Sequence, residues 1–181
     1  MVTKTPASPQ KETAPPPPAG AASVGKQIID ILAERKQTIV TAESCTGGLI
    51  AAALTDIPGA SAALYGGYVT YANAAKSKMI QVQPRLIGDY GAVSNQVARA
   101  MADGARNTAK SDYAVAVTGI AGPDGGSEKK PVGLVYVAVS SDLATVVIEH
   151  RFGDLGRDGI RKATVQAALD LVLQVLTSDE S

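Results

Sequence analysis

From about residue 23 onward, the apolar positions change repeatedly between helical and strand spacing. Val24, Ile28, Ile31 and Leu32 recur at helical spacing, and we expect Ser23 to cap this first helix. Further helices are expected over residues 49–54, 74–80, 84–90, from Ser94 to about 109, and 158–176. Strands are expected over residues 38–41, 65–71, 113–117, 132–139 and 145–152. This mixture predicts an α/β fold: a single layered α/β/α domain with a mixed sheet of about five strands.

Residues 1–21 differ in composition from the rest of the chain. They hold six of the ten prolines, four of them consecutive at Pro15 to Pro18, and no aromatic residue. Such a segment buries too little apolar surface to offset the entropy of ordering it. We therefore predict a disordered proline-rich tail over residues 1–21 and a folded domain over residues 22–178.

Composition narrows the classes of function. The chain has 181 residues, 45% of them hydrophobic, and a formal net charge of zero, as expected for a globular domain without a nucleic-acid footprint. One cysteine and one histidine predict neither a disulfide framework nor a metal site. No apolar run approaches the roughly 18 residues of a membrane span, and no secretory signal is evident. We expect a cytoplasmic protein whose partners include neither nucleic acid nor membrane.

The segment from Thr41 to Gly48 joins an expected strand to an expected helix. The C-terminal edge of an open α/β sheet is where ligands bind, and helix N–H groups at that edge attract negative charge. A hydroxyl here, such as that of Ser44, has the surroundings of an acyl-transfer nucleophile. Ser44 or Thr46 can equally cap the helix, and this segment alone favours the cap.

A nucleophilic serine needs a base, and few residues qualify. His150 alternates with Val146, Ile148 and Phe152, so it is expected to face the core as a structural residue. Lysine is the remaining common base, because desolvation can lower its pKa. Lys76 follows the strand over 65–71, although its sequence neighbours alone favour a solvated surface lysine. Cys45 is expected to be a small buried residue.

A second glycine-rich segment, Thr118 to Gly126, also follows an expected strand. Glycines let several backbone N–H groups point at one anion, which suits the wall of a site, although a plain connecting loop fits equally well. No Gly-Lys-Ser/Thr follows it, and Pro123 excludes a dinucleotide-binding helix start. Arg157 lies near the start of the last helix, where the helix dipole disfavours a cation, and this placement suggests an anionic ligand.

Together these segments resemble the CinA C-terminal domain family, the nicotinamide-nucleotide amidases, over about residues 23–176. The resemblance rests on five ordered motifs: Thr41 to Gly48, Gly67 to Lys76, Gly91 to Ser94, Thr118 to Gly126 and Lys130 to Gly133. It implies a CinA C-terminal-like fold. It also implies hydrolysis of the carboxamide of nicotinamide mononucleotide to nicotinic acid mononucleotide and ammonia, without a cofactor.

The resemblance also implies roles for individual residues. Ser44 is the expected nucleophile and Lys76 its base, with Tyr71 assisting. Backbone N–H groups from Thr46, Gly47 and Gly48 are expected to hold the oxyanion. The anionic end of a pyridine nucleotide would meet one of the glycine-rich segments, through Thr118, Gly119 and Gly122, or Arg157. We expect a homo-oligomer. The competing interpretation is a non-catalytic nucleotide-binding module that uses the same pocket.

Overall fold

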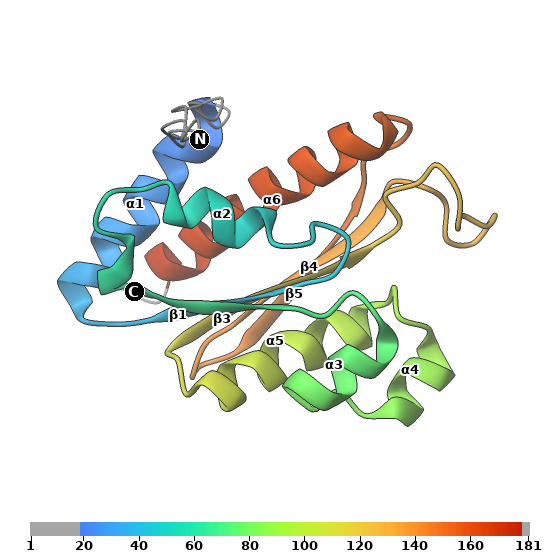
Figure 1. Cartoon of the computed structure of the whole chain (residues 1–181), viewed down its shortest axis with the longest axis horizontal. Helices are drawn as coiled ribbons and strands as arrows, with labels where there is room; N and C mark the ends of the chain where they lie inside the picture. The colour runs from blue at the N-terminus through green and yellow to red at the C-terminus, as the bar shows by residue number, and fades with distance from the viewer. Residues whose placement is uncertain (1–18, 179–181) are drawn as a thin grey trace, which may run out of the picture.

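The computed structural model describes residues 19–178 and arranges them in three layers, with a sheet between two groups of helices (Figure 1). Within these residues the sheet has five strands in the order β2-β1-β3-β4-β5. Their bounds are β1 Ile39–Glu43, β2 Leu64–Val69, β3 Tyr113–Gly119, β4 Leu134–Ser140 and β5 Thr145–Arg151. β1 runs parallel to β2 and β3, while β4 is antiparallel to both of its neighbours, β3 and β5. The predicted mixed α/β/α sheet is confirmed.

The helices divide between the two faces of the sheet (Figure 1). One face carries α1 Ala19–Arg35, α2 Leu49–Thr55 and α6 Gly156–Ser178. The other face carries α3 Asn73–Ile80, α4 Pro84–Tyr90 and α5 Asn95–Ala109. A short 3-10 helix, Ala60–Ala62, leads into β2. Among residues 19–178, no helix is both long and apolar enough to cross a membrane.

The central strands are apolar on both sides, so each face of the sheet has its own core. Val115 and Val117 of β3 pack toward α1, α2 and α6, while Ala114 and Ala116 pack toward α3, α4 and α5. Side chains alternate along a strand, and these small alanines leave room for α5 to lie close to the sheet. Gly67 of β2 makes room on the opposite face, because a Cβ there would lie 2.5 Å from Thr41 Oγ1 and 3.4 Å from the Cβ of Ala51 in α2.

Most predicted elements are found, with shifted ends. Ser94 caps α5 as expected, because its Oγ accepts a hydrogen bond from the Val97 N–H. The prediction that Ser23 caps the first helix is wrong: α1 begins at Ala19 and Ser23 lies inside it. Ala21 is buried in the core, so the predicted tail boundary at residue 21 is also wrong. Residues 1–18 of the predicted tail lie outside the described residues.

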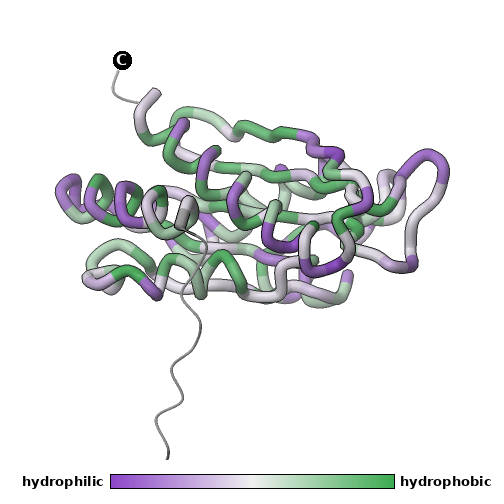
Figure 2. The backbone as a smooth tube through the Cα atoms, turned by 90° about the horizontal axis from the view of Figure 1, so that it is seen from above, coloured by the Kyte–Doolittle hydropathy of each residue, from purple (hydrophilic) through white to green (hydrophobic). Residues whose placement is uncertain are grey.

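The C-terminal ends of β1, β2 and β3 meet at one end of the molecule, on the right in Figure 1. The first turn of α6 and the loop over residues 120–133 reach the same end (Figure 1). The tip of that loop is hydrophilic (Figure 2). The topology therefore brings the segments singled out from the sequence to one sheet edge, as expected for a ligand site in an open α/β sheet.

Candidate active site

Ser44 lies where β1 turns away from the sheet. Its N–H still bonds to the carbonyl of Val117 at 3.1 Å, so the ladder with β3 holds its backbone. Neighbouring residues on a strand point to opposite faces. The side chain of Glu43 therefore reaches α2, where its carboxylate accepts the N–H groups of Gly48, Ile50 and Ala51 at 2.9–3.0 Å. The side chain of Ser44 turns the other way, toward α3.

Lys76 of α3 meets Ser44 from that face, although the local sequence favoured a surface lysine. It is only 1% exposed. Its Nζ lies 3.0 Å from Ser44 Oγ, 2.8 Å from the carbonyl of Thr70 and 3.4 Å from the carbonyl of Tyr71. Burial lowers the pKa of Lys76. None of the ion pairs found among residues 19–178 includes Lys76, so no carboxylate stabilises its charged form.

The pair opens into a small cavity at the sheet edge. The cavity has a volume of about 220 Å³ and is lined by Ser44, Cys45, Tyr71, Asn73, Lys76, Ala92, Val93, Thr118, Gly119, Ala121 and Arg157. Gly119 has to be a glycine here, because a Cβ would lie 2.6 Å from a methyl carbon of Val135. Thr118 donates its hydroxyl to the carbonyl of Ala92 at 2.8 Å and thereby ties two walls of the cavity together.

Tyr71 and Arg157 form the exposed rim of this cavity. Tyr71 is 59% exposed, and its hydroxyl accepts a hydrogen bond of 3.0 Å from Arg157. The same guanidinium donates to the carbonyl of Gly122 at 2.7 Å. The structure therefore brings Tyr71, Gly122 and Arg157 together, but the Tyr71 hydroxyl is bonded to Arg157 rather than to Ser44 or Lys76.

The expected oxyanion donors need correction. The N–H of Gly48 is already bonded to Glu43, and the N–H of Gly47 to the carbonyl of Ser44 at 3.1 Å. These two N–H groups are therefore not available to an oxyanion, because their hydrogen bonds close the turn between β1 and α2. Of the expected oxyanion donors, only the N–H of Thr46 remains. The N–H of Cys45 is a second candidate, which the sequence did not indicate. Neither of these two N–H groups is bonded to an oxygen atom within residues 19–178.

The other two candidate nucleophile or base residues are unsuited to catalysis here. Burial raises the pKa of the Cys45 thiol to about 11, so at neutral pH it is a protonated thiol. His150 does not line the cavity; its ring stacks on Phe152 with 5.3 Å between centroids, and burial lowers its pKa. The prediction that His150 is a structural residue agrees with this contact.

Two cations near the cavity had no role assigned from the sequence. Arg161 donates to the carbonyls of Cys45 and Thr46, at 3.2 and 2.9 Å. Lys130 donates to the carbonyls of Tyr90 and Val93, at 2.7 and 2.8 Å. A spacing of four residues puts Arg161 on the same face of α6 as Arg157, and that spacing was the available signal. Lys130 is brought in by a loop and had no such signal.

Across residues 19–178, no three His, Cys, Asp or Glu side chains lie close enough together to hold a metal ion.

Fold and site together define a three-layer α/β protein with a buried serine–lysine pair at the C-terminal edge of its parallel strands. Residues 21–176 match the family model of the CinA C-terminal domain, and the chain belongs to this family. It is 52% identical over 146 residues to a CinA-like protein of Acidobacterium capsulatum, covering 80% of this chain and 35% of that protein. A CinA-like protein of Geobacter sulfurreducens is 50% identical over 151 residues, with 83% and 36% covered. The chain thus spans about a third of the length of these curated relatives.

Solved structures share the whole fold. The crystal structure of competence/damage inducible protein CihA from Agrobacterium tumefaciens has a TM-score of 0.87 and 45% identity, covering 91% of this chain and 99% of that one. A CinA superfamily protein from Escherichia coli has a TM-score of 0.82 and 31% identity, covering 86% and 90%. The resemblance found in the motifs is confirmed at the level of the family. None of these names states a substrate or a reaction.

Proposed function

We propose that this protein hydrolyses the carboxamide of nicotinamide mononucleotide to nicotinic acid mononucleotide and ammonia, with Ser44 as nucleophile and Lys76 as base. The observation that carries the proposal is the 3.0 Å separation of Lys76 Nζ and Ser44 Oγ, two side chains that are both buried. A lysine without a carboxylate partner is stabilised as the neutral amine by desolvation, and a neutral amine can take a proton.

The surroundings of Lys76 orient that amine. A neutral amine has two N–H groups and one lone pair. The carbonyls of Thr70 and Tyr71 accept two hydrogen bonds from Nζ, at 2.8 and 3.4 Å. With both N–H groups used, the lone pair is left for the third neighbour, the hydroxyl of Ser44. The hydroxyl proton then lies on the line between Oγ and Nζ, as general base catalysis requires.

The reaction follows in two steps. Ser44 Oγ bonds to the carboxamide carbon while its proton moves to Lys76 Nζ, and the N–H groups of Cys45 and Thr46 stabilise the negative oxygen. Lys76 then gives the proton to the departing nitrogen, the C–N bond breaks, and ammonia leaves an ester on Ser44. Water, deprotonated by Lys76, cleaves the ester, and the proton returns to Ser44.

The charges around the cavity favour an anionic substrate. Lys130, Arg157 and Arg161 all bond to backbone carbonyls. None of them joins an ion pair within residues 19–178. Carbonyl groups do not cancel a positive charge, so these three side chains can still attract a phosphate. The N-terminus of α2 is excluded as the phosphate site, because Glu43 already occupies its N–H groups.

Ammonia release from nicotinamide mononucleotide tests the proposal, with free nicotinamide and the riboside as comparisons. Ser44→Ala should lose essentially all turnover while the melting temperature shows a folded protein. Cys45→Ser is the matched control and should keep most of the activity, because a thiol with a pKa of about 11 is not the nucleophile. If wild type binds the mononucleotide and releases no ammonia, the protein is a binding module and the proposal is wrong.

A further inference from the structure

The turn that carries Ser44 is held from outside the cavity by Arg161 of α6. Arg161 does not line the cavity and stands 115 residues further along the chain than Thr46. Its guanidinium bonds to two successive carbonyls of the turn, those of Cys45 and Thr46, at 3.2 and 2.9 Å. At the next residue, Gly47, a Cβ would lie 3.7 Å from the same guanidinium. The side chain therefore covers the outer side of the turn.

Fixing a carbonyl also fixes the N–H of the same peptide group. In a trans peptide the C=O and the N–H point in opposite directions. The peptide group whose carbonyl belongs to Cys45 carries the N–H of Thr46. With that carbonyl on Arg161, the Thr46 N–H points away from α6. The same argument applies to the next peptide group, whose N–H, that of Gly47, closes the turn onto the Ser44 carbonyl.

The N–H groups of the two residues after Ser44 are not bonded to an oxygen atom within residues 19–178. The N–H groups of Cys45 and Thr46 approach the Cys45 sulfur, where they partly offset the rise in the thiol pKa that burial causes. Cys45 is a residue of the cavity wall. The two N–H groups therefore belong to peptide groups that directly follow Ser44 in the cavity wall, and they have no oxygen acceptor of their own.

The positive charge on Arg161 adds to this effect. A hydrogen bond from a guanidinium polarises the peptide group that accepts it, and polarised groups in a chain strengthen each other's hydrogen bonds. The Thr46 N–H is thereby a stronger donor than an unassisted amide. Arg161 acts on the cavity only through this peptide group.

We infer that Arg161 is a positioning residue, which aims the Thr46 N–H into the cavity and polarises it as an oxyanion donor. The inference rests on the proposed function in one respect, that Ser44 attacks a carbon or phosphorus centre whose oxygen needs a donor. It does not depend on nicotinamide mononucleotide being the substrate. A purely structural role, as a clamp between α6 and the turn, is the interpretation to be separated from it.

The test uses the full chain with Arg161→Met, Arg161→Lys and the control Lys162→Met. Lys162 is the next residue on α6, is 61% exposed in its side chain and pairs with Asp158. The first readout is kcat and KM for nicotinamide mononucleotide. The second is the rate at which a fluorophosphonate labels Ser44, followed by intact mass. In that reaction the Oγ–P bond forms, fluoride leaves, and the hydroxyl proton goes to Lys76.

We expect Arg161→Met to lower kcat and the labelling rate roughly 100-fold, since small misplacements of a donor have effects of that size. KM should change less than about threefold, because the substrate does not touch Arg161. Arg161→Lys keeps the charge but reaches one carbonyl, so its loss should be intermediate, roughly 10-fold. The control should stay within about twofold of wild type.

The inference is overturned if folded Arg161→Met labels Ser44 at the wild-type rate, even where its melting temperature falls. That result would show that Arg161 has only a structural role, as a clamp between α6 and the turn. If Arg161→Met does not fold, Arg161→Lys decides, and a wild-type rate for it overturns the inference. If wild type labels Ser44 but releases no ammonia, the proposed function fails while the comparison of labelling rates still stands. If wild type does neither, Ser44 is not an activated nucleophile and both are wrong.

Discussion

At the scale of single residues, Lys76 shows how far the local sequence can mislead. Its neighbours on α3 are small or polar, a pattern typical of an exposed lysine. Its burial comes from the way the chain folds back around α3: the segment just after β2 supplies two carbonyls, and the end of β1, 32 residues away in sequence, supplies Ser44. No periodicity records such contacts. Only the resemblance between whole motifs led to this residue, and the structure supplies the physical reason for it.

The pH dependence of stability follows from the burial of Lys76. Its pKa is lowered from the ordinary value of 10.5. Between the lowered value and 10.5, the unfolded chain binds a proton that the folded chain does not, so the free energy of unfolding rises with pH. Lys76→Met removes this contribution. We expect the free energy of unfolding of wild type to increase relative to that of the variant as pH rises through this window. The increase should be about 1.4 kcal/mol for each unit by which the pKa is lowered.

Urea unfolding of wild type and Lys76→Met at several pH values measures that gap, with the exposed Lys78→Met as control. A gap that does not change with pH would contradict a lowered pKa. In the same series, kcat/KM should fall on the acidic side as Lys76 becomes protonated. Lys76→Met should be inactive, and Lys76→Arg should not restore activity, because a guanidinium stays protonated.

At the scale of elements, the sequence predicted which segments are helices and strands better than it predicted where they end. The ends depend on contacts with other segments. β1 extends to Glu43 instead of stopping at residue 41, because β2 and β3 continue the ladder beside it. α1 begins at Ala19, within the region assigned to the tail, since Ala21 finds a place in the core. The sequence predicted the turn after β1. It did not predict that the Glu43 carboxylate accepts hydrogen bonds from N–H groups at the start of α2.

The contact between α3 and α5 is an element-scale feature on which the site depends. Gly104 of α5 lies against the end of α3, where a Cβ would come within 1.9 Å of the Ile80 carbonyl. An alanine there must push away the helix that carries Lys76. We expect Gly104→Ala to lower the free energy of unfolding by about 2 kcal/mol and to reduce kcat, because Nζ moves away from Ser44 Oγ.

Gly88→Ala in α4 is the matched control for this prediction. No heavy atom lies within 4 Å of a Cβ placed there. Alanine favours a helix over glycine, so the control should raise the free energy of unfolding by about 0.5–1 kcal/mol and leave kcat unchanged. Urea unfolding and ammonia release measure both variants. Equal effects of the two substitutions would show that the α3–α5 contact does not position Lys76.

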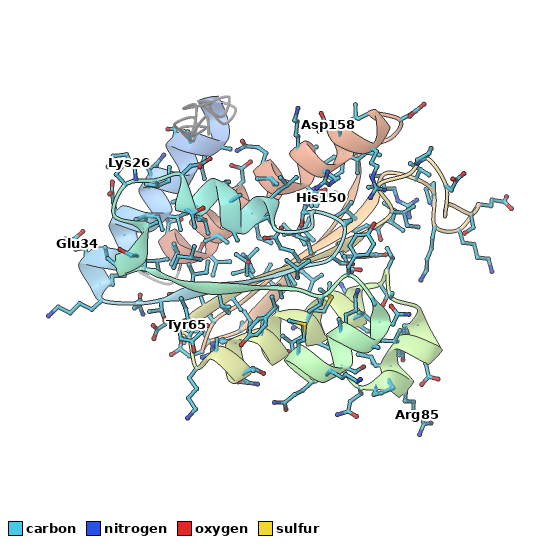
Figure 3. All side chains as sticks on the ribbon, viewed as in Figure 1. Lys26, Glu34, Tyr65, Arg85, His150 and Asp158 are labelled. Atoms are coloured by element: carbon cyan, nitrogen blue, oxygen red, sulfur yellow. The ribbon has the colours of Figure 1, made fainter. Side chains whose placement is uncertain are left out.

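At the scale of the whole molecule, the net charge of zero hides an uneven distribution. Lys26 and Arg85 project from the outer sides of their helices (Figure 3). Each pairs with a carboxylate four residues further along, Lys26 with Asp30 and Arg85 with Asp89. Lys130, Arg157 and Arg161 gather near the cavity and bond to backbone carbonyls there, as Arg99 and Arg106 do elsewhere on the surface. Composition alone could not predict where the charged side chains gather, because it counts them without regard to their positions in the folded chain.

That distribution leads to a prediction about substrate selection through Arg157. Its guanidinium lies at the cavity rim, bonded to the Gly122 carbonyl and the Tyr71 hydroxyl. We expect Arg157→Ala to lower kcat/KM for nicotinamide mononucleotide roughly 10–100-fold, the size of a lost charge-assisted hydrogen bond. For the riboside, which lacks the phosphate, the loss should be below about threefold. Arg85→Ala, on the outer surface of α4 (Figure 3), is the control and should change neither.

A third variant separates reading the phosphate from shaping the rim. Tyr71→Phe removes the hydroxyl that Arg157 holds but leaves the charge of the guanidinium in place. If Arg157 reads the phosphate, this variant should keep most of its preference for the mononucleotide over the riboside, because the attraction to an anion does not need the tyrosine. If Arg157 only holds the rim in shape, Tyr71→Phe and Arg157→Ala should each lower kcat/KM equally for the mononucleotide and for the riboside. The phosphate would then have to be bound by Lys130 or by backbone N–H groups of the loop over residues 120–133, since Glu43 already occupies the N-terminus of α2.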